Sequence, residues 1–191
     1  MPADFNHIES IKERISAHRP MTLRDDSHRR ACVLVPLVHQ NGSLHLLLTK
    51  RTDRVEHHKG QISFPGGMVD ETDRSPDHTA LRELEEELGI PPSFVELFGT
   101  LSDIQIPTGF IVTPLVGYIR SLDAMTINSA EVAEALLVPF ERFFDPSLCH
   151  EEIRLLKGAN RRIHVYDVWR EPVWGATAHI IKQLTELLEQ P

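Results

Sequence analysis

Cysteine is scarce in this sequence, with two residues among 191, Cys32 and Cys149. Their separation gives neither a metal-ligand spacing nor a disulfide framework, so we interpret both as free thiols in a reducing compartment. The chain also lacks an apolar run long enough to span a bilayer, and residues 1–19 contain no apolar signal-peptide core. We therefore expect a cytoplasmic protein with no membrane partner.

A surplus of basic residues is also missing. The chain has 20 Lys and Arg against 28 Asp and Glu, a formal net charge of −8. A protein that grips a nucleic-acid backbone needs the opposite balance on one face, so we expect no nucleic-acid partner. A small anionic substrate remains compatible, provided that bound cations or a locally basic loop offset the overall field.

Other catalytic patterns are absent as well. Ser63, Ser75 and Cys149 lack the surroundings of a nucleophile elbow, which argues against acyl transfer, and the histidines have no zinc spacing. The aromatic residues near 140–144 are interpreted as core or interface packing. If they are exposed, they are compatible with a homodimer.

What the sequence contains is typical of a folded α/β protein. Hydrophobic residues make up 41% and charged residues 25%, and the length suits one domain, residues 1–191, with a helical N-terminal extension over 1–25. Asn41-Gly42 between two apolar runs predicts a hairpin. The pattern predicts helices over 8–17, 76–88 and 175–188, a helical turn over 139–144, and strands over 31–38, 44–49, 62–64, 95–101, 111–119 and 162–168.

The helix expected over 76–88 has clear ends and two different sides. Ser75-Pro76 is a typical helix start, and Gly89 is a typical end. At 3.6 residues per turn, its leucines cluster within about 60°, whereas three glutamates fan out over about 100° elsewhere. These residues are Leu81, Leu84 and Leu88 on one side, and Glu83, Glu86 and Glu87 on the other.

Three neighbouring glutamates near a helix C-terminus repel one another and oppose the helix dipole. Bound Mg²⁺ or Mn²⁺ would relieve both effects, because hard cations prefer carboxylate oxygens and keep waters for substrate phosphates. The alternative is an ordinary solvated acidic face. A Gly-Gly turn expected at Gly66-Gly67, just before the helix, favours the metal site, since bare backbone lets a diphosphate approach closely.

These residues resemble the Nudix box. Gly67, then Arg82-Glu83-Leu84, Glu86-Glu87 and Gly89-Ile90 follow its pattern. The first half departs, because Asp73 stands where the pattern has Glu and lies one residue further from Arg82. We take Asp73 as the acid that orients Arg82, ahead of Asp70 and Glu71.

The resemblance implies a fold, a cofactor and residue roles. It implies an α/β/α sandwich with a mixed sheet, and two or three Mg²⁺ or Mn²⁺ ions held by Glu83, Glu86, Glu87 and the Gly66 carbonyl. Glu83 would also help to activate the attacking water, and no covalent nucleophile is needed. A late acid often completes such sites, and here Glu131 is preferred to Glu134. The candidate catalytic residues are Arg82, Glu83, Glu86 and Glu131.

Several segments between Leu47 and Ala178 are similar to the coenzyme A pyrophosphatase branch of this superfamily. They are Leu47–Arg51, Gly60, Phe64–Gly67, Thr108-Gly109, Val112–Pro114 and Trp174–Ala178. The likeness implies hydrolysis of coenzyme A or acyl-CoA to 3′,5′-ADP and a phosphopantetheine. The chain departs from the branch signature at Thr52 and Glu56.

A basic loop just before the glycine pair supports a multiply phosphorylated ligand. It contains Arg51, Arg54, His57, His58 and Lys59. The candidate substrate-binding residues are Arg51, Arg54, His58, Lys59, Gly66 and Gly67. The alternative is an exposed polar loop without a binding role. Two other functions stay open: a pyrophosphatase for ADP-ribose or dinucleotides, and a catalytically silent nucleotide-binding sensor.

Overall fold

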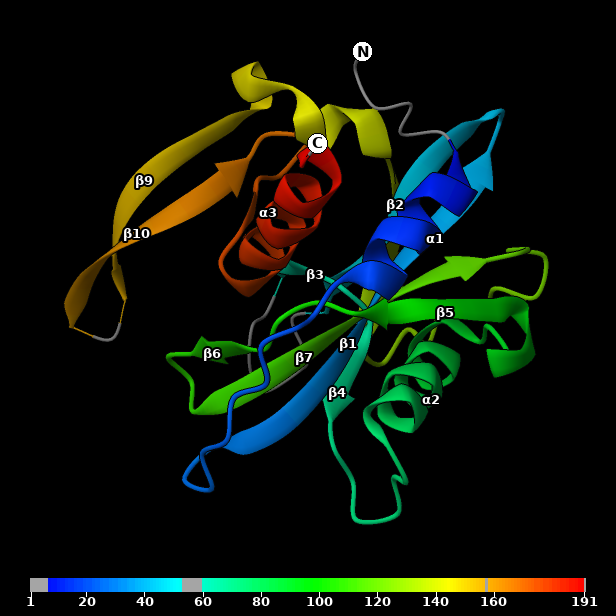
Figure 1. Cartoon of the computed structure of the whole chain (residues 1–191), viewed down its shortest axis with the longest axis horizontal. Coiled ribbons are helices and arrows are strands. Elements are labelled where there is room, and N and C mark those ends of the chain that lie inside the picture. The colour runs from blue at the N-terminus through cyan, green and yellow to red at the C-terminus, as the bar shows by residue number, and fades with distance from the viewer. Residues whose placement is uncertain (1–6, 53–59, 157, 191) are drawn as a thin grey trace.

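The computed structural model describes residues 7–52, 60–156 and 158–190. Three α-helices are present in this part of the chain: α1 (Ile8–Ala17), α2 (Pro76–Leu88) and α3 (Ala176–Glu189). The strands are β1 (Arg29–Gln40), β2 (Ser43–Arg51), β3 (Ile62–Ser63), β4 (Gly66–Met68), β5 (Val95–Thr100), β6 (Ile104–Ile106), β7 (Phe110–Ile119), β8 (Val132–Pro139), β9 (Cys149–Leu156), β10 (Ala159–Tyr166) and β11 (Val173–Trp174). Figure 1 shows how they are arranged.

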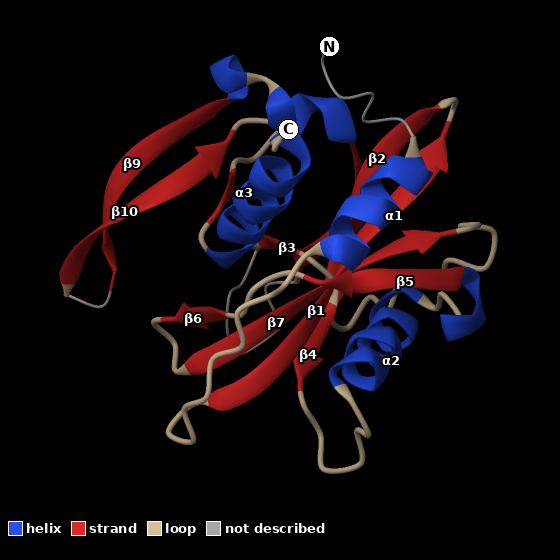
Figure 2. Ribbon diagram, in the orientation of Figure 1, coloured by secondary structure: helices blue, strands red, loops and turns tan. Residues whose placement is uncertain are grey.

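The main sheet is mixed, with the central path β3-β2-β1-β7-β5. β1 pairs in parallel with β7 along ten residues, from Arg29 opposite Phe110 to Val38 opposite Ile119. Strands β4, β6 and β8 add antiparallel pairs to β1, β7 and β2. The expected mixed sheet between helical layers is therefore confirmed (Figure 2).

The β1–β2 hairpin forms as its turn residues predict. Asn41 and Gly42 have φ values of 52° and 81°. Two consecutive positive φ values characterise the turn whose twist matches a two-residue hairpin. The flanking residues Gln40 and Ser43 are direct partners, so the turn fixes the register of both strands.

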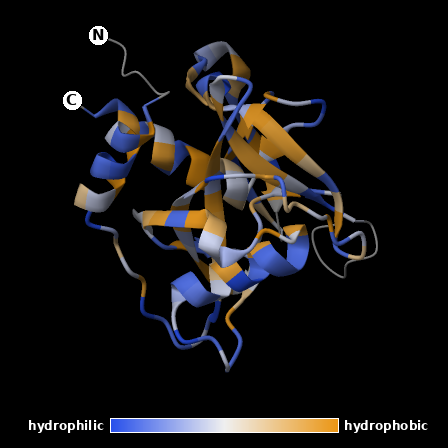
Figure 3. Cartoon of the chain, turned by 90° about the vertical axis from the view of Figure 1, so that its right-hand side faces the viewer, coloured by the Kyte–Doolittle hydropathy of each residue, from blue (hydrophilic) through white to orange (hydrophobic). Residues whose placement is uncertain are grey.

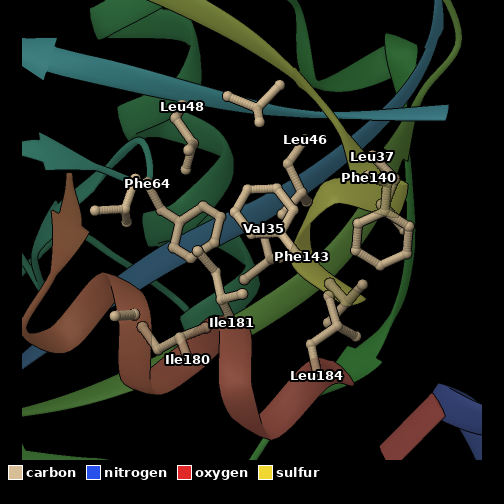
Figure 4. Packing of buried hydrophobic residues seen from close by; sticks show 14 of the residues in the cluster. Val35, Leu37, Leu46, Leu48, Phe64, Phe140, Phe143, Ile180, Ile181 and Leu184 are labelled. Carbon is tan, nitrogen blue, oxygen red and sulfur yellow. The ribbon is translucent and has the colours of Figure 1, made fainter. Parts of the chain in front are cut away.

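The sheet is buried on both faces, and β1 contributes to both cores. Val35 and Leu37 pack on the side of α1 and α3, whereas Leu34 and Val38 pack on the side of α2. Successive strand residues point to opposite faces, so this near-continuous apolar run suits a strand covered on both sides. Figure 4 shows Ile180, Ile181 and Leu184 of α3 packed beside sheet residues and Phe143, and Figure 3 shows that the sheet strands are predominantly hydrophobic.

A second sheet of three strands, ordered β11-β10-β9, lies beside α3. Its β9–β10 hairpin extends away from the rest of the molecule (Figure 1). Two large aliphatic side chains on β9, Ile153 and Leu155, are each 71% exposed. The outer edge of β9 has no strand beside it among the described residues.

One expectation needs correction. Gly66-Gly67 is not a turn, because both residues belong to β4 and pair with Val33 and Cys32 of β1. The acidic segment near Glu131 leads into a strand, β8. The interpretation of the aromatic residues at 140–144 as core packing is confirmed for Phe140 and Phe143, which are 1% and 3% exposed. No helix of the described residues is long and apolar enough to cross a membrane.

Candidate functional site

The caps of α2 fix the positions of its acidic residues. Ser75 accepts a hydrogen bond from the backbone N–H of His78, and Pro76 occupies the first turn, where its missing N–H leaves no bond unmade. Gly89 closes the helix in the left-handed conformation, with its N–H bonded to the Glu85 carbonyl at 2.8 Å. The helix therefore runs over Pro76–Leu88, as predicted, and places the glutamates in its second half.

Arg82 is the centre of an ionic network. Its Nε and Nη2 donate to the two oxygens of Asp73 at 3.1 and 3.0 Å, a bidentate pair. Its Nη1 donates to Glu83 and Glu86, both at 2.9 Å. A further bond from Nη2 reaches the Met68 carbonyl at 3.2 Å. One guanidinium thus joins the helix to the chain that precedes it.

Asp73 is the partner of Arg82, as expected. Its side chain is fully buried and also accepts bonds from Thr79 Oγ1 and from the backbone N–H of Asp70, both at 2.9 Å. The Arg82 hydrogen bonds hold the pKa of this carboxyl well below its usual value. The Asp70 carboxylate instead caps its own turn by accepting from Thr72.

Glu87 is the unexpected member of the acidic group. It is 1% exposed, and its Oε2 is buried without a hydrogen-bond partner. The Arg51 guanidinium lies 3.5 Å from Oε1. Burial raises the pKa of Glu87 to about 8, although Arg51 and the Gly66 backbone act in the opposite direction. On the helical wheel, Glu87 lies about 60° from buried Leu84, which explains why it turns inward.

Glu83 lies over β4 in a space that exists because residue 67 has no side chain. A Cβ built on Gly67 would lie 2.3 Å from Glu83 Oε1. Burial raises the pKa of Glu83, and the hydrogen bond from Arg82 opposes that rise. Gly67 is therefore needed for clearance above a strand rather than for a turn.

Gly66 is restricted by the backbone of β1. Its φ is 155°, and a Cβ there would lie 2.4 Å from the carbonyl oxygen of Cys32. Close pairing of β4 with β1 thus excludes any side chain at this position.

Glu131 and Glu134 have different surroundings. The negative charge of Glu131 raises the pKa of both Glu83 and Glu87. Glu134 pairs with Arg170 on the exposed surface. The preference for Glu131 as the acid that completes the site stays a prediction.

Asn128 has a structural role that the sequence did not reveal. Its backbone N–H bonds to the Glu87 carbonyl at 2.9 Å, and its Nδ2 donates to Glu131 Oε1 at 3.3 Å. Its Oδ1 accepts from the backbone N–H of Ala130 at 3.1 Å. Asn is a known turn residue, because its side chain can accept a hydrogen bond from the backbone two residues on, and this signal could have identified it.

The basic loop is described in part. Arg54, His57, His58 and Lys59 lie outside the described residues, as does Glu56. Arg51, at the end of β2, contacts the buried Glu87 rather than open solvent. Thr52 donates its hydroxyl to the Ala130 carbonyl at 3.0 Å and its N–H to the Glu131 carbonyl at 2.9 Å. The departure at Thr52 therefore connects β2 to the Glu131 turn.

The described residues contain no preformed cluster of three or more His, Cys, Asp or Glu side chains around one metal position. The Arg82 guanidinium contacts one oxygen of Glu83 and one of Glu86. Three observations nevertheless fit a hard cation: the unpartnered oxygen of Glu87, the clearance above Gly67 and the all-carboxylate donor set. A divalent cation here would satisfy a buried oxygen that the protein leaves unpaired.

Comparisons with known proteins identify the family of the chain. The NUDIX domain matches residues 28–158. The chain is 38% identical to "Uncharacterized Nudix hydrolase NudL" of Pectobacterium atrosepticum over 96% of each chain, and 38% identical to the Escherichia coli K12 protein of the same name over 93% and 92%.

Solved structures show the same fold. A MutT/nudix family protein from Enterococcus faecalis aligns with a TM-score of 0.56 and 14% identity over 88% of this chain and 65% of that one. RenU, a Nudix hydrolase from M. smegmatis, aligns with a TM-score of 0.51 and 19% identity over 63% of this chain and 76% of that one. With its family match, its NudL relatives and its mixed sheet between helical layers, the chain belongs to the NUDIX family and is a Nudix hydrolase.

Proposed function

We propose that this chain hydrolyses the diphosphate linkage of coenzyme A or an acyl-CoA, using Mg²⁺ or Mn²⁺, to give 3′,5′-ADP and a phosphopantetheine. The observation that carries the metal-dependent part is the unpartnered Glu87 oxygen, buried beside Glu83 and Glu131. Nudix hydrolases act on nucleoside-diphosphate-linked substrates, so the proposal adds the identity of the nucleotide.

The cation would be held by Glu83, Glu86, Glu87 and the Gly66 carbonyl. A bound divalent cation supplies charge neutralisation for phosphoryl oxygens and lowers the pKa of a coordinated water. Within the protein, Arg82 positions Glu83 and Glu86 through its 2.9 Å bonds, and Asp73 holds Arg82 in place. Glu131 is the further acid near the reacting water.

The coenzyme A assignment rests on the sequence segments from Leu47 to Ala178 that resemble that branch. A 3′-phosphate distinguishes coenzyme A from most nucleoside diphosphates and calls for additional cations. Arg54, His58 and Lys59 are the proposed contacts, with Arg51 at the base of the same segment. Gly66 and Gly67 allow the diphosphate to approach the backbone.

A product assay tests the proposal. The protein is incubated with coenzyme A, ADP-ribose or NADH, each with Mg²⁺ or Mn²⁺, and the products are separated by chromatography. We expect 3′,5′-ADP from coenzyme A. Faster hydrolysis of ADP-ribose or NADH would assign the chain to the alternative pyrophosphatase class. Tight binding without product would identify a sensor, and either result contradicts the proposal.

A matched pair of variants tests the metal site. Glu86→Gln should lower kcat about 10²–10³-fold, because one charged oxygen is lost where phosphoryl charge develops. Glu85→Gln is the control, since the neighbouring Glu85 is exposed on the same helix and should keep full activity. Circular dichroism should show the same fold for both. Full activity of Glu86→Gln with added Mg²⁺ would remove Glu86 from the site.

A further inference from the structure

The outer edge of β9 is exposed, belongs to a hairpin that projects from the molecule, and lies beside charged side chains. The β9–β10 hairpin extends from the body of the molecule (Figure 1), and no strand pairs with the far side of β9 among residues 7–52, 60–156 and 158–190. Ile153 and Leu155 are each 71% exposed on one face of this strand. Open edges with exposed aliphatic residues are normally avoided, because they template pairing with another chain.

The opposite face of β9 carries an ordered pair of opposite charges. Arg154 Nε donates to Glu152 Oε2 at 2.7 Å, and the Arg154 guanidinium lies 4.8 Å from the centre of the Trp174 ring. His150 contacts the other Glu152 oxygen at 3.0 Å. These contacts hold one negative and one positive side chain on either side of Ile153.

We propose that β9 pairs antiparallel with β9 of a second copy of this chain, about a two-fold axis through Ile153. In this register Glu152 of one copy is opposite Arg154 of the other, twice, and Ile153 faces its own copy. An axis through Arg154 or through Glu152 would instead set that charge against itself. Among these three axes, charge favours the one through Ile153.

This pairing closes after two copies. Each chain has one β9 edge, and an isologous contact about a two-fold axis uses both edges completely. The two three-stranded sheets become one continuous sheet, and the exposed backbone of β9 gains partners. The occupant of this edge is therefore a second copy, and the assembly is a dimer rather than a fibre.

Charge-reversal variants test the pairing, with mass measured by light scattering after size-exclusion chromatography over a wide concentration range. The wild type should reach the mass of a dimer. Glu152→Arg and Arg154→Glu should each stay monomeric, because like charges then face each other across the edge. An equimolar mixture of the two variants should recover the dimer mass, since each supplies the charge that the other lacks.

Glu141→Arg is the matched control, an exposed acid away from this hairpin, and it should dimerise like the wild type. A loss of folding cannot mimic the expected pattern, because mixing would not restore a misfolded edge. A wild type that is monomeric throughout, single variants that remain dimeric, or a mixture that stays monomeric would each overturn the proposal.

Cross-linking tests the register. In a Cys149→Ser background, Ile153→Cys should form a covalent dimer with oxidised glutathione, since the axis brings the two copies of position 153 together. Leu155→Cys should not, because its two copies lie four residues apart, about 13 Å along the strand and beyond the reach of about 7 Å between Cα atoms. Equal cross-linking at both positions, or none at 153, would exclude this register.

Discussion

Asp73 and Glu87 are two buried carboxylates that face arginines, yet they differ in almost every other respect. Asp73 receives hydrogen bonds from Arg82, Thr79 and a backbone N–H, and its pKa is lowered. Glu87 has a guanidinium at 3.5 Å and one unpartnered oxygen, and its pKa is raised to about 8. Asp73 therefore has the surroundings of a carboxylate that stabilises the structure. Glu87 has surroundings that fit its proposed role as a cation ligand.

Replacing Glu87 should give the largest difference between the effect on activity and the effect on stability. Glu87→Gln should lower kcat about 10²–10³-fold through loss of a ligand, while metal-free stability stays the same or rises, because a neutral amide replaces a carboxyl whose ionised form is poorly solvated. Thermal melts with and without Mn²⁺ provide the second reading. The wild type should gain stability with Mn²⁺ by mass action, and the variant should gain much less. An undiminished Mn²⁺ shift in Glu87→Gln would show that Glu87 is not a ligand.

Replacing Asp73, in contrast, should mainly lower stability. Asp73→Asn should lower the free energy of unfolding by about 2–3 kcal/mol, because the buried Arg82 pair loses its charge. The lowered pKa of Asp73 means that its contribution is complete above the usual value of 3.8 and fades as pH falls through the folded pKa. Urea titrations should therefore give a constant difference from wild type at neutral pH that shrinks only in strong acid. A difference that vanishes already near pH 6 would contradict the anchor role.

Gly67 offers a way to move a candidate ligand without touching either buried acid. Gly67→Ala should displace Glu83, whose Oε1 would otherwise lie 2.3 Å from the new Cβ, and lower kcat about 10–100-fold. Stability should change by less than about 1 kcal/mol, because the clashing atoms are the end of a flexible side chain. Gly42→Ala is the control: its Cβ meets no atom within 4 Å, but φ is 81°, so stability falls while activity stays. Wild-type activity in Gly67→Ala would show that Glu83 need not occupy this position.

The smallest effect is expected at Asn128, whose side-chain amide donates a hydrogen bond to Glu131. Asn128→Ala should lower kcat about threefold to tenfold, because Glu131 loses its 3.3 Å hydrogen bond and gains freedom. Ser129→Ala, at an exposed neighbour, is the control and should behave like the wild type. A KM effect of equal size in both variants would indicate a general loosening of the turn instead of a role at Glu131.

Local signals in the sequence account for much of the fold. The limits of α2 follow from Ser75-Pro76 and Gly89, and the β1–β2 register follows from Asn41-Gly42, because each signal acts within a few residues. β4 was missed because Gly-Gly-Met has no side-chain alternation to detect. Its pairing with β1 is a backbone interaction between segments more than thirty residues apart.

The residue types of the candidate site could be predicted from the sequence, but the burial of each side chain could not. Helical spacing placed the glutamates together, but it could not show that Glu87 is buried while the Glu86 side chain is 53% exposed. That difference depends on where the sheet lies relative to the helix, which is a tertiary property. The pairing of Asp73 with Arg82 was anticipated from the resemblance to the Nudix box, in which an acid stands at this place.

The alternation along β1 has a consequence for how this chain can change length. Val35 and Leu37 serve one core, Leu34 and Val38 serve the other, and β4, β2 and β7 all take their register from this strand. Deleting a single residue within it would exchange the two sets of side chains and shift three neighbours at once. Length variation among relatives should therefore accumulate at the Asn41-Gly42 tip and in the outer loops, while β1 keeps a constant length through sequence divergence.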